Sequence, residues 1–390
     1  MRYESSSGPS IVIITSSYPI EGNGSEAAGG FVADLAQAMA REIPVKVVAP
    51  GITSCVEKDS SRVTVYRFAA PMKALSQLKP YKPVDAWQIS RVLRNGHKAA
   101  LEAARSGEVA HILALWALPC GAWARKVSRE ISVPYSIWTL GSDIWTLGRI
   151  PIVRSCLRQV IADAKYCYSD GIQLKKDTEQ ISGRAVDFLP STRHISLKRA
   201  TPVRSGPPYR LLFIGRWHPN KGIDLLMDSL NMLGHDDWRK IESVHIHGGG
   251  PLSGTVETIA DALQRKGFPV HVHGYIKKEE AEAALAEADY LLIPSRIESI
   301  PVVFSDAMKM GCPVIAMPTG DLPQLIAGDA PCGVVASEIS AAAFATAIHQ
   351  ALELGPSSML EGVNDMARHF DLDCIAKRML KEMNGNQVGA

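Results

Sequence analysis

Residues 290–316 read Tyr-Leu-Leu-Ile-Pro-Ser-Arg-Ile-Glu-Ser-Ile-Pro-Val-Val-Phe-Ser-Asp-Ala-Met-Lys-Met-Gly-Cys-Pro-Val-Ile-Ala. Short apolar runs open and close this stretch, and the segment between them has helical character, which predicts a strand, helix and strand of a parallel sheet. Ser299 is expected to cap the helix, Pro301 suits its first turn, and Gly311 suits its C-terminal stop. The free amides of that first turn attract an anion.

Two carboxylates accompany this predicted helix. Glu298 lies just before the free amides, where it can hydrogen-bond a polyhydroxylated group or face a developing positive charge. Asp306 follows eight positions later, about two helical turns on, so both carboxylates are expected on the same side.

A second segment, Phe213-Ile-Gly-Arg-Trp-His-Pro-Asn-Lys-Gly-Ile-Asp-Leu-Leu-Met227, runs from a strand through a cationic loop into a helix. Open parallel sheets bind ligands beyond the carboxyl ends of their strands, so Arg216 and Lys221 are both expected at that edge. Arg offers a bidentate fork and Lys a compact charge, and together they suit a departing diphosphate. The alternative interpretation is a solvated loop without a ligand.

The chain as a whole alternates strands and helices in two series. Its 390 residues, 46% of them hydrophobic, are enough for two sizeable cores. Residues 200–208, Ala-Thr-Pro-Val-Arg-Ser-Gly-Pro-Pro, continue neither a helix nor a central strand and predict a linker. The predicted domains are residues 1–203, residues 204–366, and a C-terminal helix within residues 367–390.

These motifs resemble those of glycosyltransferase family 4, the retaining, metal-independent group 1 glycosyl transferases of the GT-B fold. The resemblance covers most of the chain and is specific from Phe213 to Gly320. It rests on Gly215-Arg216 with Lys221-Gly222, on Pro294-Ser-x-x-Glu-x7-acid-Ala-Met-x-x-Gly-x-Pro-Val-Ile315, and on Gly248-Gly-Gly-Pro251, Gly274-Tyr-Ile276 and Ala288-Asp289. It implies an α/β fold with two Rossmann-like domains facing across a cleft. Periodicity does not assign the C-terminal helix, so packing on the N-terminal domain and packing on the C-terminal domain both stay open.

The resemblance also implies roles for individual residues. Arg216 and Lys221 would hold the donor diphosphate, and Glu298 the donor sugar near its anomeric carbon. Amides of residues 300–302 would contact sugar and phosphate, Asp306 the ribose, and the backbone of 274–276 the nucleobase. A glycine loop in the N-terminal domain would let diphosphate and acceptor approach. The implied catalytic residues are Glu298, Arg216, Lys221 and Asp143, and the donor-binding residues are Gly29, Gly30, Gly215, Gly248, Gly274, Tyr275, Ile276, Ser299, Ile300, Pro301, Val302 and Asp306.

Two departures from the family pattern bear on activity. The second carboxylate is usually Glu, and Asp306 is one methylene shorter. The N-terminal domain usually carries His-Gly-Ser-Asp, whereas this chain has Leu140 before Gly141-Ser142-Asp143. In the family this histidine contacts the donor sugar. Losing one such hydrogen-bond donor costs on the order of 100-fold in rate. Three interpretations remain open. Asp143 or Thr139 replaces the missing contact with the sugar, the protein uses a different sugar, or the protein is inactive.

Two pairs of histidines, His245 with His247 and His271 with His273, suggest a metal site. Alternation along a strand produces the same pattern, and no cysteine or carboxylate pair is spaced to complete a tetrahedral site. The prediction is therefore that the chain has no metal ligand. His247 and His273 are more informative as position markers. They directly precede Gly248 and Gly274, which places them at the ends of strands that face the binding crevice.

Charge is divided unequally along the chain. Residues 1–208 carry 27 Lys+Arg and 17 Asp+Glu, a net +10, whereas residues 209–390 carry 15 and 23, a net −8. The region from Arg67 to Lys98 is the most basic, with Asp85 as its only acid. Its cations alternate with aromatic and apolar side chains, which favours contact with an anionic membrane or, alternatively, a solvated helix. No motif matches a nucleic-acid reader.

The cysteine content and the N-terminus predict the compartment. Seven cysteines without a Cys-x-x-Cys pair fit neither a disulfide framework nor a zinc ribbon. The first apolar run, Ile11–Ile14, is shorter than a signal-peptide core. A cytoplasmic protein is expected, either free or peripheral on the cytoplasmic face of the membrane.

The predicted function is that of a hexosyltransferase-type enzyme that needs neither a metal nor another cofactor. Its donor would be a UDP- or GDP-linked sugar, and its acceptor a cell-surface polysaccharide, lipopolysaccharide or lipid-linked glycan precursor. Two alternatives remain: a catalytically silent GT-B subunit that binds glycans or organises a complex, and a sugar-nucleotide epimerase on the same fold.

Overall fold

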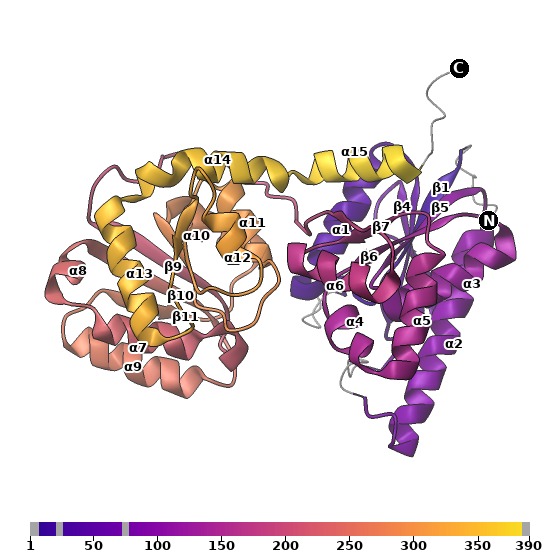
Figure 1. Ribbon diagram of the computed structural model, residues 1–390, viewed down its shortest axis with the longest axis horizontal. Helices are drawn as coiled ribbons and strands as arrows, with labels where there is room; N and C mark the ends of the chain where they lie inside the picture. The colour runs from indigo at the N-terminus through magenta and orange to yellow at the C-terminus, as the bar shows by residue number, and fades with distance from the viewer. Residues whose placement is uncertain (1–7, 21–25, 72–77, 384–390) are drawn as a thin grey trace. The chain divides into compact units, whose positions relative to one another are not determined.

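The structure is a computed structural model that describes residues 8–20, 26–71 and 78–383. It divides into two compact units, of which unit 1 comprises Met1–Arg193 with Leu372–Ala390 and unit 2 comprises His194–Asp371. Each unit has its own sheet with helices on both faces (Figure 1). The predicted α/β class with two predominantly parallel sheets is confirmed.

The sheet of unit 1 has, among the described residues, eight strands in the order β3-β4-β2-β1-β5-β6-β7-β8. β3 pairs antiparallel with β4, and the other neighbours are parallel. Every residue of β1 is buried, as expected for a central strand covered on both faces. The strands are β1 (Ser10–Ile14), β2 (Val45–Gly51), β3 (Cys55–Lys58), β4 (Val63–Ala69), β5 (Val109–Leu115), β6 (Tyr135–Thr139), β7 (Cys167–Ser169) and β8 (Asp187–Phe188).

Helices cover both faces of this sheet. One core cluster lies under α2, α3 and α5, and another under α1 and α15. No helix within the described ranges combines the length and hydropathy needed to cross a membrane. The helical elements are α1 (Glu26–Ala40), α2 (Pro83–Arg105), η2 (Ala117–Gly121), α3 (Ala122–Ile131), α4 (Ser142–Trp145), η3 (Leu147–Arg149), α5 (Pro151–Ala162), α6 (Ile172–Ser182) and α15 (Leu372–Met383).

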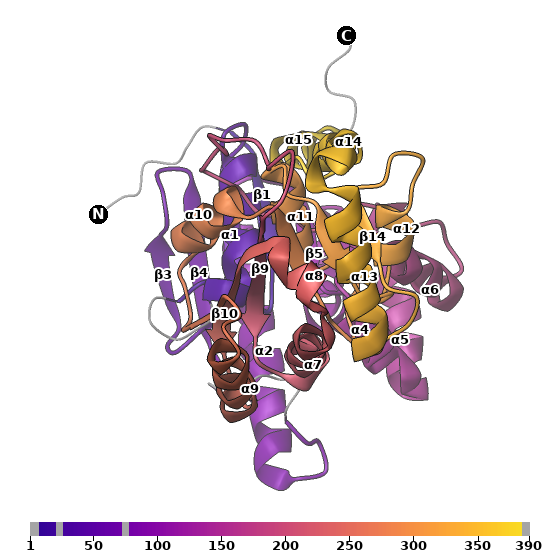
Figure 2. The same ribbon diagram turned by 90° about the vertical axis from the view of Figure 1, so that its left-hand side faces the viewer.

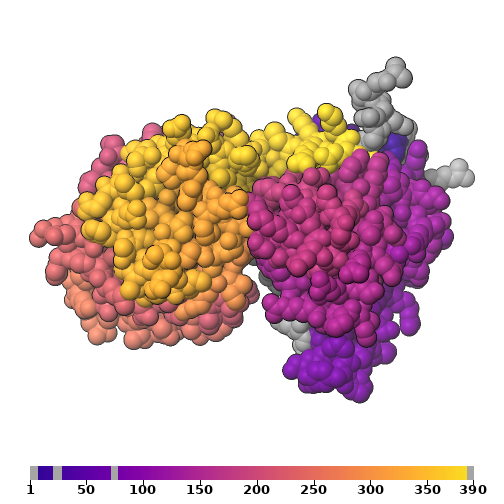
Figure 3. Space-filling model, in the orientation of Figure 1, coloured from indigo at the N-terminus to yellow at the C-terminus, as the bar shows by residue number. Residues whose placement is uncertain are grey.

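The last helix, α15, packs on α1 although more than 300 residues separate them (Figure 1). Its apolar side buries Met379 completely, whereas its outer side forms part of the surface of unit 1 (Figure 3). Arg41 pairs with Asp373 at 2.6 Å, and the Tyr168 hydroxyl donates to Glu382 at 2.5 Å. These contacts attach the C-terminal helix to unit 1.

The sheet of unit 2 has six parallel strands within the described residues, in the order β11-β10-β9-β12-β13-β14. α7, α9 and α13 bury one apolar core against one face and are neighbours in both views (Figures 1 and 2). The strands are β9 (Tyr209–Arg216), β10 (Ile241–Gly249), β11 (Val270–His273), β12 (Tyr290–Ile293), β13 (Val314–Ala316) and β14 (Gly333–Val335). The helical elements are η4 (Pro219–Lys221), α7 (Ile223–Met232), α8 (His235–Arg239), α9 (Ser253–Arg265), α10 (Lys278–Glu287), α11 (Val302–Lys309), α12 (Leu322–Ile326), α13 (Ala341–Leu354), η5 (Pro356–Met359) and α14 (Leu360–His369).

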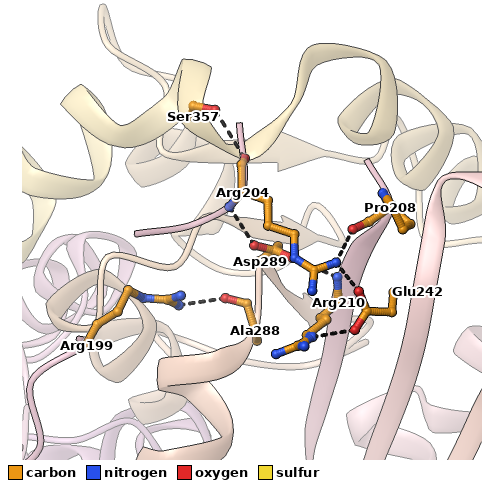
Figure 4. A network of polar contacts seen from close by, with 8 residues as sticks. All are labelled: Arg199, Arg204, Pro208, Arg210, Glu242, Ala288, Asp289 and Ser357. Atoms are coloured by element: carbon orange, nitrogen blue, oxygen red, sulfur yellow. Dashed lines mark hydrogen bonds and ion pairs between the residues drawn. The ribbon is translucent and has the colours of Figure 1, made fainter. Parts of the chain in front are cut away.

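The segment before β9 belongs to unit 2, which differs from the predicted boundary after residue 203. Arg199 donates to the backbone carbonyl of Ala288 at 2.6 Å (Figure 4). The Arg204 amide donates to Asp289 at 2.9 Å, and its guanidinium pairs with Glu242 (Figure 4). Proline and glycine interrupt the pattern at residues 200–208, but they do not show that two arginines fasten this segment to unit 2.

The second boundary also differs from the prediction. Unit 2 extends to Asp371, because α14 packs on α11, and Phe304 meets Phe370 edge to face at 5.7 Å. The segment assigned to unit 1 therefore begins at Leu372 rather than at residue 367.

Candidate functional site

The carboxyl ends of β9 and β10 approach closely because their facing residues are glycines. Gly215 pairs with Gly248, and Arg216 with Gly249, in the parallel register. A Cβ on Gly248 would lie 1.9 Å from the Gly215 carbonyl oxygen, and the φ of Gly248 is +149°. Glycine is therefore required here, and the strand ends form a compact backbone platform.

The loop after β11 reaches the same edge of the sheet. The Gly248 amide donates to the Gly274 carbonyl at 3.1 Å. The Tyr275 hydroxyl donates to the Gly249 carbonyl at 2.6 Å, while 71% of the Tyr275 surface is exposed. The structure thus brings together four predicted donor-binding residues, Gly215, Gly248, Gly274 and Tyr275, with Ile276 next in the chain.

Lys221 and Glu298 meet although they come from different loops. The Lys221 ammonium forms an ion pair with Glu298 Oε1, which also accepts a hydrogen bond from the Ser295 hydroxyl at 3.3 Å. Gly222 makes this approach possible, since its φ is +66° and a Cβ would lie 1.8 Å from the Pro294 carbonyl oxygen. The predicted cation Arg216 is exposed at the end of β9. The arrangement offers two positive charges and a carboxylate beyond the carboxyl ends of β9 and β12.

A bidentate clamp, which the sequence analysis missed, holds these two loops together. Arg296 donates to both carboxylate oxygens of Asp224, at 2.7 and 2.6 Å. It also donates to the Pro219 carbonyl at 2.6 Å through its side chain and to the Asn220 carbonyl at 2.9 Å through its amide. Hydrogen bonding from Arg296 lowers the pKa of Asp224. Both residues lie inside the quoted motifs, but no spacing in the sequence pairs them.

The loop that carries Glu298 is also supported from beyond β13. Gly320, with φ +54°, lies so close that a Cβ there would be 2.2 Å from the Glu298 carbonyl oxygen. The Thr319 hydroxyl donates to the Ser295 carbonyl at 3.0 Å. These contacts fix the backbone on both sides of Glu298, whose side chain is 14% exposed.

The start of α11 differs from the prediction. The helix begins at Val302 with Pro301 at its N-cap, so Ser299 does not cap it. Within the described part of the chain, the buried Ser299 hydroxyl has no hydrogen-bond partner. Pro301 has no N–H, so the predicted contact through the amides of residues 300–302 is reduced to Ile300 and Val302.

Asp306 is placed differently from the sequence interpretation. Glu298 lies in the loop before α11, so the two carboxylates are not on one continuous helix. Asp306 has 0% exposed surface, and the Lys309 ammonium is 3.9 Å from its carboxylate. Asp306 therefore lies beneath the surface, and its contact with a ribose stays a prediction.

In unit 1, the predicted glycine loop is helical. Gly29 and Gly30 lie in the N-terminal part of α1, which begins at Glu26. A Cβ on Gly29 would lie 2.7 Å from the Pro19 nitrogen, so this glycine allows the helix to approach the segment after β1. For Gly30, no described atom lies within 4 Å of the Cβ position.

Asp143 is an internal anchor of unit 1. It is 1% exposed, and its carboxylate accepts hydrogen bonds from the amides of Ala117 at 2.6 Å and Ile144 at 3.2 Å. Burial raises its pKa to about 6, although the backbone hydrogen bonds oppose the shift. Its predicted place among the catalytic residues is therefore not supported, because the carboxylate joins the turns after β5 and β6 instead of reaching the surface. Leu140, at the departure from the family pattern, is partly buried beside it.

The family comparison covers most of unit 2. Residues 208–354 match the family described as glycosyl transferases group 1. The chain is 26% identical over 229 residues to the putative teichuronic acid biosynthesis glycosyltransferase TuaC of Bacillus subtilis, covering 55% of this chain and 54% of that protein. Across the first three curated relatives, the match spans 29%, 63% and 54% of their lengths.

Solved structures match over nearly the whole chain. Sucrose-phosphate synthase from Thermosynechococcus elongatus aligns with a TM-score of 0.65 and 17% identity, covering 95% of this chain and 97% of that one. HepE from Anabaena, in complex with UDP-glucose, aligns with a TM-score of 0.64 and 15% identity, covering 96% and 99%.

These likenesses define the fold as GT-B. Residues 208–354 match the group 1 glycosyl transferases, which agrees with the family resemblance drawn from the sequence motifs.

Proposed function

We propose that this chain transfers a sugar from a nucleotide-diphosphate donor to a glycan acceptor in polysaccharide or lipopolysaccharide biosynthesis. The observation that carries the proposal is the Lys221–Glu298 ion pair, which joins two loops that the Arg296–Asp224 clamp also holds together. This arrangement lies in the segment that matches the group 1 glycosyl transferases. The match to this family supports the class of reaction, and the geometry supports the residues proposed to perform it.

The ion pair has a direct role in this proposal. A donor diphosphate gives Lys221 a new anionic partner and releases Glu298 to accept hydrogen bonds from the donor sugar. Arg216 adds a planar fork that can bind two phosphate oxygens. As the sugar–phosphate bond breaks, negative charge grows on the diphosphate, and the two cations stabilise that charge in the transition state.

Three finer features belong to the same proposal. The cations perform the charge stabilisation that a divalent metal performs elsewhere, so transfer proceeds without a catalytic metal. The anomeric configuration is retained, as in the family that the motifs resemble. The donor is a UDP- or GDP-linked hexose. HepE was solved with UDP-glucose, which favours UDP as the first nucleotide to test.

The acceptor assignment follows the relatives. TuaC is a putative glycosyltransferase of teichuronic acid biosynthesis, and WaaB, which shares the fold with a TM-score of 0.64, is a lipopolysaccharide outer core galactosyltransferase. We propose an acceptor of this kind, a growing envelope polysaccharide, lipopolysaccharide or lipid-linked glycan, modified on the cytoplasmic side of the membrane.

A transfer assay tests the proposal. UDP-glucose, UDP-galactose and GDP-mannose are offered with lipid-linked glycan extracts, and release of UDP or GDP is measured with and without EDTA. Acceptor-dependent release that EDTA leaves unchanged is expected with one donor. Glu298→Gln and Lys221→Met should each reduce it by about 100-fold or more. The exposed controls Asp261→Asn, on α9, and Lys266→Met, at the end of α9, lie outside the motifs and should retain the wild-type rate.

The same assay separates the alternatives. An altered sugar nucleotide formed without acceptor would indicate an epimerase, and nucleotide binding without turnover of any donor would indicate a silent subunit. Unchanged turnover in Glu298→Gln would overturn the site assignment. A strict requirement for manganese would overturn the metal-independent mechanism.

We also propose that α2 contacts anionic membrane. Its N-terminal half projects from the rest of unit 1 (Figures 1 and 2) and exposes Val84 and Trp87, with Arg91 stacked on Trp87 at 5.5 Å. Two cations of the basic region do not contribute to this argument. Arg67 is buried and paired with Glu57 at 2.8 Å, and Lys73 lies outside the described residues.

Vesicle co-sedimentation tests this contact. Vesicles of phosphatidylcholine are compared with vesicles that also contain phosphatidylserine, using wild type, a Trp87→Ala/Arg91→Ala variant and the control Lys377→Ala on the exposed face of α15. Binding should require phosphatidylserine and be lost only in the α2 variant. Equal binding to both kinds of vesicle would contradict the electrostatic contribution.

A further inference from the structure

Four histidines gather on one face of the sheet in unit 2. In the parallel register of β10 and β11, His245 pairs with His271 and His247 with His273. Alternation along a strand explains why each pair shares a face, but the register explains why the two pairs face each other. The sequence analysis treated the pairs separately and predicted no metal ligand, because a sequence does not display strand register.

Three of these imidazoles lie at ligand-forming distances. The nitrogen atoms that His245, His247 and His273 offer all lie within 4.8 Å of one another. His245 Nδ1 and His273 Nε2 are 3.0 Å apart, and the rings of His247 and His273 stack at 4.4 Å. Within the described ranges, no other group of three histidine, cysteine or acidic side chains comes this close.

We propose that His245, His247 and His273 bind a divalent transition-metal ion of the zinc class. Zinc bonds imidazole nitrogen at about 2.0–2.1 Å, so ligand nitrogens around a tetrahedral ion lie roughly 3.3 Å apart. The 3.0 Å pair already has nearly this spacing. The three rings lie within 17° of parallel, so binding one ion requires the imidazoles to turn until their nitrogens converge on it. Ligands made only of imidazole suit zinc, cobalt, nickel and copper rather than magnesium or calcium.

The surroundings of the cluster support an ion site. A cavity of about 470 Å³ opens beside it, lined by His245, His247 and His271 together with Glu287 of α10. It leaves room for a water molecule as the fourth ligand. Arg210 also lines the cavity, but it pairs with Glu242 at 2.8 Å, which offsets its repulsion of a cation.

A hydrogen-bonded cluster without metal is the competing explanation. The 3.0 Å contact between His245 and His273 is a hydrogen bond when no ion is present. It does not account for His247, whose buried Nδ1 has no hydrogen-bond partner among the described residues. An ion satisfies all three imidazoles at once, whereas the hydrogen bond satisfies only two.

The ion would cross-link two strands at a sensitive position. β11 is the edge strand of the sheet, and it would be joined to β10 at residues that immediately precede Gly248 and Gly274. Metal binding therefore stabilises the edge of unit 2. The inference does not depend on the proposed transfer reaction, because no chemical step is assigned to the ion.

Metal titration of the full chain, prepared without a polyhistidine tag, tests the site. Co²⁺ should produce the visible absorption of a tetrahedral site at one equivalent, and Zn²⁺ should displace it and raise the midpoint of thermal unfolding. His245→Ala and His273→Ala should each weaken Zn²⁺ binding by at least about 100-fold, since loss of even an outer-shell partner costs 10–100-fold.

Controls keep the result interpretable. His235→Ala and His349→Ala remove histidines of unit 2 that lie outside the cluster and should leave Zn²⁺ affinity unchanged. Circular dichroism of the apo variants shows that each is folded. Zn²⁺ affinity that is the same in wild type and in a folded His245→Ala/His273→Ala variant would overturn the proposal, as would the absence of stoichiometric Co²⁺ binding in wild type.

Discussion

Lys221 and Glu298 are 77 positions apart, and their meeting depends on residues that carry no charge. Gly222 turns the chain through a left-handed conformation against Pro294, and Gly320 lies against the backbone of Glu298. Neither glycine tolerates a Cβ at the distances observed. At the scale of residues, the candidate site is therefore built by close backbone packing, and the charged groups are placed by it.

Gly222 and Gly311 allow a matched test of this packing. Their φ angles are +66° and +67°, but a Cβ would meet the Pro294 carbonyl at 1.8 Å only at Gly222, and at Gly311 no described atom lies within 4 Å. Gly311→Ala should cost about 1–2 kcal/mol for the left-handed conformation. Gly222→Ala should cost about 1–3 kcal/mol more through overpacking. Denaturant unfolding measures both, and equal losses would contradict the packing argument.

The Arg296–Asp224 clamp should act as a positioning device for the two loops. Arg296→Lys keeps the charge but loses the bidentate geometry, and Asp224→Asn loses the ionic partner. Each should weaken binding of UDP or GDP, and the double variant should be little worse than either single one, because all three break the same contact. Titration calorimetry measures the cycle. Arg239→Lys, in an exposed pair with Asp236, is the control and should have no effect. Additive losses would show that the clamp does not act as one unit.

His111 should make the stability of unit 1 depend on pH. It is fully buried with Nε2 2.8 Å from the Ser136 hydroxyl, and burial lowers its pKa to about 3. Between that value and about 6.5 the unfolded chain binds a proton that the native state excludes, so stability falls as pH falls below about 6.5. Between pH 7.5 and pH 5 the loss attributable to His111 should be about 2 kcal/mol.

The comparison variant for this prediction is His111→Gln, which keeps a hydrogen-bonding group and removes the titration. Denaturant unfolding of both proteins at the two pH values gives the difference. Asp143 has the opposite effect, because its raised pKa makes stability increase as the pH falls from about 6 to about 4. It is present in both proteins, so its contribution to the difference between them cancels. If wild type and variant lose stability equally on acidification, His111 is not the source.

At the scale of elements, α15 is a structural part of unit 1. Its buried side, including Ile375 and Met379, continues the core beneath α1. Met379→Ala should reduce the free energy of unfolding of unit 1 by about 2–5 kcal/mol. Lys377→Ala on the exposed side should change it by no more than about 0.5 kcal/mol. Calorimetric scans measure both changes, and a loss confined to unit 2 would contradict the assignment of this helix.

The central strands could be predicted because their sequences are short, apolar and bounded by turns. The apolar runs that open and close residues 290–316 are examples, and they form β12 and β13. The brief edge strand β8 and the exposed β3 have no comparable apolar signal. Edge strands are defined by the neighbour they pair with, which sequence patterns do not reveal.

The candidate site was predictable in its composition and less so in its geometry. Among the motif residues, Lys221 meets Glu298 and Gly215 meets Gly248. The burial of Asp143 and Asp306 could not be foreseen, because burial depends on how neighbouring elements pack and not on residue type. The Arg296–Asp224 clamp and the facing histidines depend on contacts across 72 and 28 positions, for which one sequence contains no signal.

At the scale of the whole molecule, the division observed in the structure preserves the charge asymmetry. Unit 1 carries 27 Lys+Arg and 19 Asp+Glu, a net +8, and unit 2 carries 15 and 21, a net −6. Arg216 and Lys221 are therefore cations within an acidic unit. Their location at the strand edge gives that unit a local site for an anion, whereas the positive net charge of unit 1 suits an anionic acceptor or lipid surface.

The central claim is that this site in unit 2 binds the diphosphate of a nucleotide sugar. Calorimetric titration of the full chain with UDP, GDP, UMP and GMP tests it most directly, in wild type and in Lys221→Met. One diphosphate should bind at least about tenfold more tightly than its monophosphate, and Lys221→Met should remove most of that advantage. Diphosphates that bind no better than monophosphates, or a Lys221→Met variant that binds as wild type does, would contradict the account.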